Sequence, residues 1–120
     1  MRARRAAGAL LATGVAAAAV IPAADGATTP PPRKTVKVGD DYFAPAKLTV
    51  RRGTVVVFKW LNSNTSSHDV KLRRAPRGVK RWHSDPAATY YSYRRKLRVR
   101  GKYNVVCTFH VGMVMNIVVK

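Results

Sequence analysis

The run Thr54-Val55-Val56-Val57-Phe58-Lys59-Trp60-Leu61 is rich in β-branched and aromatic residues and is long enough for a central β-strand. Shorter segments on both sides of it alternate apolar and polar residues with a period of two, which is typical of strands. These segments are 35–38, 47–51, 70–73, 91–97, 103–107 and 115–119.

Turn-forming sequences separate the segments at 39–41, 52–53, 62–64, 85–86 and 100–101. About seven strands with regular turns predict an all-β fold, a β-sandwich of two sheets. No helical period, repeat or second domain interrupts this pattern. Residues 73–83, which include Pro76 and Gly78, are basic and predict a long exposed loop between two strands.

The N-terminal part has the composition of an export signal. Arg2, Arg4 and Arg5 precede the apolar, alanine-rich run 6–20, and small residues follow it at 21–24. We expect cleavage between Ala23 and Thr28. An uncleaved membrane anchor is the alternative, and the pair at positions 4 and 5 also allows a twin-arginine signal.

These features divide the chain into three parts. We predict a signal peptide over residues 1–27, a Pro-rich linker over 28–33 and a single domain over 34–120. The linker is expected to be stiff and extended because it contains three consecutive prolines. An exported protein of this kind would lie in the periplasm, outside the cell or in the cell envelope.

The charge of the chain is strongly unbalanced. It has 23 Lys and Arg against 5 Asp and Glu, and three of the Arg and Asp25 fall within residues 1–27. The remainder keeps 20 basic and 4 acidic residues, a formal charge of +16. Such a protein attracts acidic proteins, anionic membranes or cell-wall surfaces. We expect no nucleic-acid partner for an exported chain.

The only cysteine lies in the sequence Cys107-Thr108-Phe109-His110-Val111-Gly112-Met113. A single cysteine forms no internal disulfide, and an unoccupied thiol is a liability in an oxidising compartment. A thiolate, an imidazole and a thioether within one short loop are soft ligands that favour copper. His68, which opens the strand at 70–73, is the candidate for a second imidazole.

Each of these residues has another explanation. A single Cys-x2-His pair can occur in a sequence by chance. A methionine in a loop beside a strand more often packs against the core than binds a metal, and a histidine such as His68, taken alone, is more often a surface turn residue. Zinc also accepts one cysteine and two histidines. The order of the four residues at strand ends favours copper, and ligands on strand ends would form a rigid site.

The chain resembles the small cupredoxins of the plastocyanin and amicyanin group from about Lys34 to Lys120. The resemblance rests on Val38–Pro45 with Leu48–Gly53, on Trp60–Asn62 with His68–Val70, and on Gly101–Met113. It implies a Greek-key β-sandwich and one type 1 copper ion bound by His68, Cys107, His110 and Met113. It also implies a function in one-electron transfer.

Three positions depart from that pattern. Met115 is a second candidate for the axial ligand, although the short loop favours Met113. Asp69 replaces an Asn that helps to hold the ligand loop, and its carboxylate would either keep that role or pair with an Arg. Val111 replaces a Pro, which would loosen the loop. His83 is expected to be an exposed loop residue.

We therefore expect an electron carrier without catalytic activity. The resemblance implies that the edge of His110 contacts the partner. Phe109, Val111 and Gly112 would form an apolar patch around that edge. We expect the basic surface to guide acidic redox partners towards a monomeric protein. The alternatives are extracytoplasmic copper binding or delivery without a redox partner, and adhesion to an anionic surface.

Overall fold

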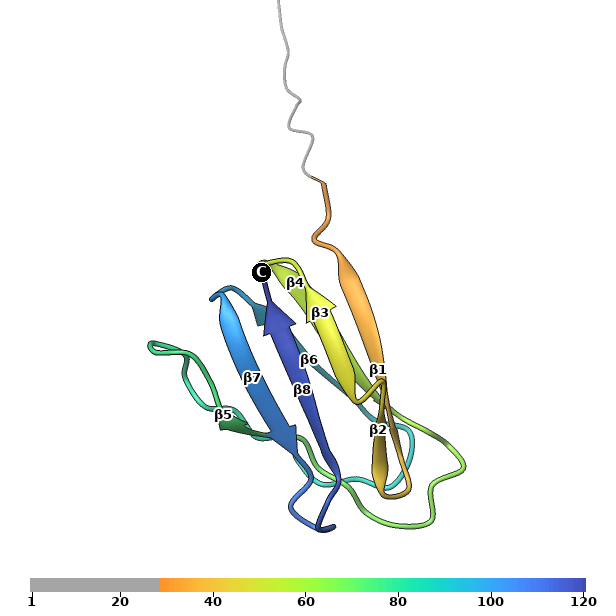
Figure 1. Cartoon of the computed structure of the whole chain (residues 1–120). Coiled ribbons are helices and arrows are strands. Elements are labelled where there is room, and N and C mark those ends of the chain that lie inside the picture. Colours follow the sequence, from red (N-terminus) through yellow and green to blue (C-terminus); the bar gives the residue numbers. More distant parts are fainter. Residues whose placement is uncertain (1–28) are drawn as a thin grey trace, which may run out of the picture. The chain divides into compact units, whose positions relative to one another are not determined.

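The structure, a computed structural model, describes residues 29–120, so the predicted signal peptide lies outside the described residues. Figure 1 shows two β-sheets packed face to face. The strands are β1 (Arg33–Gly39), β2 (Tyr42–Ala44), β3 (Lys47–Val50), β4 (Thr54–Trp60), β5 (Lys71–Arg74), β6 (Ser92–Leu97), β7 (Gly101–Val106) and β8 (Val114–Val119). The described residues contain no helix that could cross a membrane.

The order of the strands confirms the predicted β-sandwich. One sheet has the order β2-β1-β4-β6 and the other has the order β3-β8-β7-β5. β1 pairs with β4 in parallel, in the register Val36 with Phe58, and β3 pairs with β8 in parallel. The remaining pairs are antiparallel. Short β2 is the strand that the alternating segments did not predict separately.

The core lies between the two sheets, where alternate residues of each strand point inward. In β4 the side chains of Val56, Phe58 and Trp60 are almost fully buried, while Lys59 is exposed. Tyr103 on β7 is also buried, and its hydroxyl donates to the carbonyl of Val99 at 2.6 Å. Phe58, Trp60 and Tyr103 therefore all belong to the core.

The prediction of one exposed loop over residues 73–83 is wrong in two respects. Arg73 and Arg74 belong to β5, which pairs with β7. Trp82 is half-buried, and its ring lies 6.1 Å from that of Phe58. The sequence did not show this because Trp82 is a single aromatic residue among Pro, Gly and five Lys and Arg, and its contact with the core depends on how the loop folds back.

Most loops of the sandwich gather at two opposite ends, while the segment after β5 projects to the side (Figure 1). One end, here called the cysteine end, consists of the loops 40–41, 61–70, 84–91 and 107–113. The other, here called the basic end, consists of Arg33 at the start of β1, the turns 51–53 and 98–100, and Lys120. Backbone hydrogen bonds join the parts of the basic end: Gly53 donates to Leu97 and Arg52 to Lys120.

Candidate metal centre

The loop 107–113 connects β7 to β8 at the cysteine end and is closed by two backbone hydrogen bonds. The N–H of Cys107 donates to the carbonyl of Met113 at 3.0 Å, and the N–H of Met113 donates to that of His110 at 3.3 Å. The turn between His110 and Met113 contains Gly112 with a φ of 87°, a left-handed conformation that glycine adopts without strain. The loop therefore closes without the proline that Val111 replaces.

His68 lies in the adjacent loop 61–70 and is fully buried. Its backbone exchanges two hydrogen bonds with Ala87, at 2.8 and 3.0 Å. Its carbonyl also accepts a bond of 3.2 Å from the indole Nε1 of Trp60. A residue held from both sides in this way has little freedom, so the ring of His68 has a defined position.

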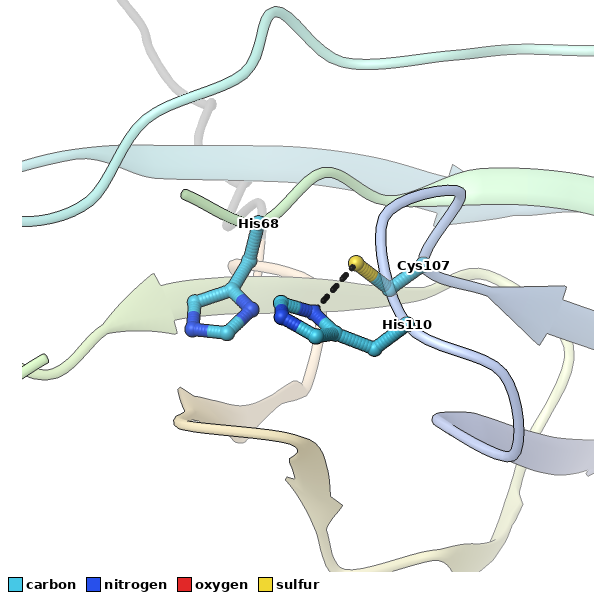
Figure 2. Close-up of side chains that lie close together, drawn as sticks. All are labelled: His68, Cys107 and His110. Carbon is cyan, nitrogen blue, oxygen red and sulfur yellow. Dashed lines mark hydrogen bonds between the residues drawn. The ribbon is translucent and has the colours of Figure 1, made fainter. Parts of the chain in front are cut away.

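The structure brings His68, Cys107 and His110 together. One ligand atom from each of these three residues lies within 4.8 Å of the others. Figure 2 shows the thiol of Cys107 beside the two imidazole rings, with Sγ 3.7 Å from Nδ1 of His110. The centroids of the two rings are 4.9 Å apart. Two nitrogens and one thiol sulfur are thus placed around one point.

The outer nitrogens of both histidines face carboxylates that the sequence analysis treated only as turn residues. Nε2 of His68 lies 2.9 Å from Asp40, and Nε2 of His110 lies 3.2 Å from Asp41. The hydrogen bond from His68 holds the pKa of Asp40 well below its usual range, and backbone N–H donors, first that of Thr65, add to this effect.

The remaining nitrogen of His68 shows that the site fits a metal. Nδ1 of His68 is buried and has no hydrogen-bond partner. A buried polar atom without a partner is costly, and a metal ion would satisfy it. A carboxylate on the other nitrogen fixes the tautomer that leaves this lone pair free, as is usual for histidine ligands. The donor set of two imidazoles and one thiol suits copper.

The two methionines occupy different places. Both are buried, at 1% exposure for Met113 and 0% for Met115. Met113 lies at the closure of the ligand loop, opposite the backbone of Cys107. Met115 pairs with Val105 inside the sheet, farther from the cysteine along both strands. This placement puts Met113, rather than Met115, beside the loop that carries Cys107 and His110.

Asp69 ties the two halves of the site together. Its carboxylate accepts hydrogen bonds of 2.6 Å from both the backbone N–H and the hydroxyl of Thr108. His83 Nε2 lies 2.6 Å from the same carboxylate. Burial raises the pKa of Asp69, but the bonds from His83 and Thr108 outweigh it, so the pKa lies below its usual value. Asp69 therefore keeps the structural role.

The partner of Asp69 was not predicted. The sequence allowed an Arg, but within the described residues every ion pair of a carboxylate is with a histidine. His83, expected to be an exposed loop residue, is about half exposed, but it is also connected to the loop 107–113 through Asp69. An isolated bridge between His83 and Lys71 places it there, a contact that sequence spacing does not reveal.

Cys107 is buried and forms no disulfide. Burial raises the pKa of its thiol, and backbone hydrogen bonds from Asp69 and Phe109 act in the opposite direction. Without a cation beside it the sulfur therefore holds its proton, whereas a bound metal would favour the thiolate.

The model of the copper-binding proteins of the plastocyanin/azurin family matches residues 33–120. The chain belongs to this family. Its cofactor is a type 1 copper ion, in agreement with the donor set described above. No curated protein sequence matches the chain.

Three solved structures illustrate the similarity of the fold. The reduced state of an amicyanin variant is 21% identical, with a TM-score of 0.63, over 72% of this chain and 80% of that chain. The pseudoazurin from Methylobacterium extorquens AM1 is 24% identical, with a TM-score of 0.63, over 72% and 74%. A copper-containing nitrite reductase from Thermus scotoductus SA-01 is 25% identical, with a TM-score of 0.66, over 83% of this chain but only 25% of that enzyme.

Proposed function

We propose that this protein is a one-electron carrier that holds a type 1 copper ion with His68, Cys107 and His110, and with Met113 as the axial ligand. The observation that carries the proposal is the convergence of three donor atoms at a buried point where Nδ1 of His68 has no other partner. The bound copper would supply the one-electron redox chemistry. The chain would supply a rigid, dry site in which the geometry changes little between the two oxidation states.

Exposure differs among the proposed ligands and points to the place of electron exchange. His68, Cys107 and Met113 are buried, whereas the side chain of His110 is 26% exposed. Phe109 and Val111 flank it and are 52% and 108% exposed. The His110 edge is thus where a partner would approach the site most closely, and its apolar neighbours would exclude water from the contact.

The distribution of charge over the domain indicates which kind of partner surface would contact the cysteine end. Among the described residues no Lys or Arg lies in the four loops of the cysteine end, and all four Asp do. The exposed apolar residues Tyr42, Tyr90 and Val114 surround the same end. The basic residues would still attract acidic redox partners from a distance, but the contact at His110 would be made by an apolar surface.

We also propose that the chain is exported and acts as a monomer in the periplasm or cell envelope, without catalytic activity. The basic and apolar N-terminal sequence supports export, and membership of a family of small copper proteins agrees with it. The nitrite reductase does not support an enzymatic role here, because the chain corresponds to only a quarter of it.

The test is a Cu(II) titration of the purified protein, followed by visible absorption and electron paramagnetic resonance. One equivalent of copper should give an intense blue thiolate-to-copper band and a narrow hyperfine splitting, both removed by ascorbate. Cys107→Ser should lose the blue band. A colourless or ordinary copper spectrum, or retention of the band in Cys107→Ser, would contradict the proposal.

Two further variants decide the axial ligand. Met113→Leu should shift the spectrum and the reduction potential, whereas Met115→Leu should leave both close to those of the parent, because Met115 lies within the sheet. The reverse result would assign the axial position to Met115. A site that binds copper reversibly but shows no reversible potential would indicate copper delivery.

A further inference from the structure

The basic residues of this protein have no acidic partners within the domain. All 20 Lys and Arg of residues 29–120 are exposed. None of them forms an ion pair with a carboxylate, because the described ion pairs all involve histidine. Unpaired like charges destabilise a compact protein by mutual repulsion. An external anion bound to these residues would relieve that repulsion.

The basic end collects six of these residues on one small surface. The turn 51–53 contributes Arg51 and Arg52, and the turn 98–100 contributes Arg98 and Arg100. Arg33 and Lys120 lie beside them, since Arg33 pairs with Val55 and Arg52 donates to the carbonyl of Lys120. No Asp lies at this end among the described residues. The two ends of the sandwich therefore differ in sign of charge.

A groove of about 220 Å³ opens beside the basic end and shares Arg98 with it. Its apolar lining includes Trp82, Leu97 and Tyr103, and Lys80 and Arg95 are among its basic residues. Val99, at the tip of the 98–100 turn, is 37% exposed. This combination of cationic and apolar surface suits an amphipathic anion, a phospholipid, better than it suits a purely polar polymer.

The position at which the N-terminal sequence joins the domain is consistent with membrane binding through the basic end. Residues 29–32 lead into β1 at the basic end, so the apolar sequence 6–20 is joined to the domain there. If that sequence is retained, the basic end is the part of the domain attached closest to the membrane. Anionic headgroups attract clustered Lys and Arg within about a Debye length of the surface.

We propose that the basic end binds a membrane surface containing anionic phospholipids and turns the cysteine end away from it. The His110 edge then faces the solution, where a soluble partner reaches it. Membrane binding itself is independent of copper. Only the meaning of the outward orientation rests on the proposed electron transfer, so failure of one does not imply failure of the other.

The test measures sedimentation with vesicles of 30% phosphatidylglycerol in phosphatidylcholine, and with vesicles of phosphatidylcholine alone, at 100 mM NaCl. It uses the full chain and residues 29–120, a part that contains the whole described core within one compact unit. The parent should sediment with the anionic vesicles, and for residues 29–120 the neutral vesicles should bind at least tenfold less. Circular dichroism verifies that each variant is folded.

Two variants with equal changes in charge locate the surface. One replaces Arg51, Arg52, Arg98 and Arg100 by Gln at the basic end. The control replaces four exposed strand residues elsewhere by Gln, namely Lys37, Lys47, Lys59 and Lys71. Each basic residue at an anionic surface contributes roughly fivefold to binding. The first variant should therefore lose about 600-fold in partition, and the control less than about fivefold.

Equal losses in the two variants would overturn the proposal, because binding would then follow total charge. Absence of binding to the anionic vesicles would also overturn it. If polyphosphate still bound in that case and the first variant abolished the binding, the basic end would instead recognise an acidic polymer. The orientation is measured with the copper-loaded protein: hydroquinone should reduce it equally fast with and without vesicles, and slower reduction on vesicles would overturn the outward orientation.

Discussion

The cysteine end and the basic end are built by the same eight strands but differ in almost every surface property. At the cysteine end, exposed apolar residues and four Asp surround a buried group of donor atoms. At the basic end, two short turns carry Arg residues and no ligand. A sandwich separates its two sets of loops by the length of its strands, so the two ends can be changed independently.

The largest expected effects come from core residues next to each end, whose replacement changes both the free energy of unfolding and, at the cysteine end, the copper spectrum. Trp60→Ala should lower the free energy of unfolding by about 3–5 kcal/mol, because it removes a fully packed aromatic side chain. It also removes the hydrogen bond to the carbonyl of His68. We expect the blue band to weaken as well. Urea unfolding and visible absorption of the copper-loaded protein measure the two effects.

Leu97→Ala is the control for Trp60→Ala, because it removes a buried core side chain next to the basic end. Leu97 is as deeply buried as Trp60 but lies at the other end of the sheet, where it pairs with Thr54. It should cost about 2–5 kcal/mol in stability and leave the copper spectrum unchanged. A changed spectrum in Leu97→Ala would mean that the two ends are not independent.

A smaller effect is expected for Asp69, which links the loop of His68 to the ligand loop. Asp69→Ala should cost about 1–3 kcal/mol, because the backbone N–H and the hydroxyl of Thr108 lose their charged acceptor. Asp69→Asn keeps an acceptor and should recover most of that loss. Asp85→Ala, an exposed change at the same end, is the control for charge. Equal unfolding midpoints for Asp69→Ala and Asp85→Ala would show that the link carries no stability.

These comparisons also show which features the sequence could predict. Strands such as β4 were predictable because burial alternates along them, and the ligand loop because Cys107, His110 and Met113 are close in the chain. The contacts of Asp40 with His68 and of His83 with Asp69 join segments 28 and 14 residues apart. Such contacts depend on how the loops of two sheets meet, and no local pattern encodes them. The separation of acidic and basic residues between the two ends could not be predicted for the same reason, because it depends on which loops meet in the fold.

One glycine at each end allows the same substitution to be compared for its effects on stability and on the copper spectrum. Gly112 in the ligand loop and Gly53 in the turn 51–53 have φ angles of 87° and 92°, and a Cβ at either position would meet no atom within 4 Å. Replacement of either by Ala should therefore cost about 1–2 kcal/mol through backbone strain alone. Only Gly112→Ala should alter the copper spectrum. A spectral change in Gly53→Ala would contradict a purely local effect.

The smallest expected effect is that of salt, and it tests the imbalance of charge directly. Because the exposed Lys and Arg have no carboxylate partners, screening should relieve repulsion more than it weakens attraction. Raising NaCl from 10 to 500 mM should therefore increase the urea midpoint of residues 29–120. The increase should shrink when Arg51, Arg52, Arg98 and Arg100 are replaced by Gln. It should be at least as large when Asp40 or Asp41 at the other end is replaced by Asn, since those changes raise the net positive charge. A midpoint that falls with salt in the parent would show that attraction at the cysteine end outweighs repulsion among the basic residues.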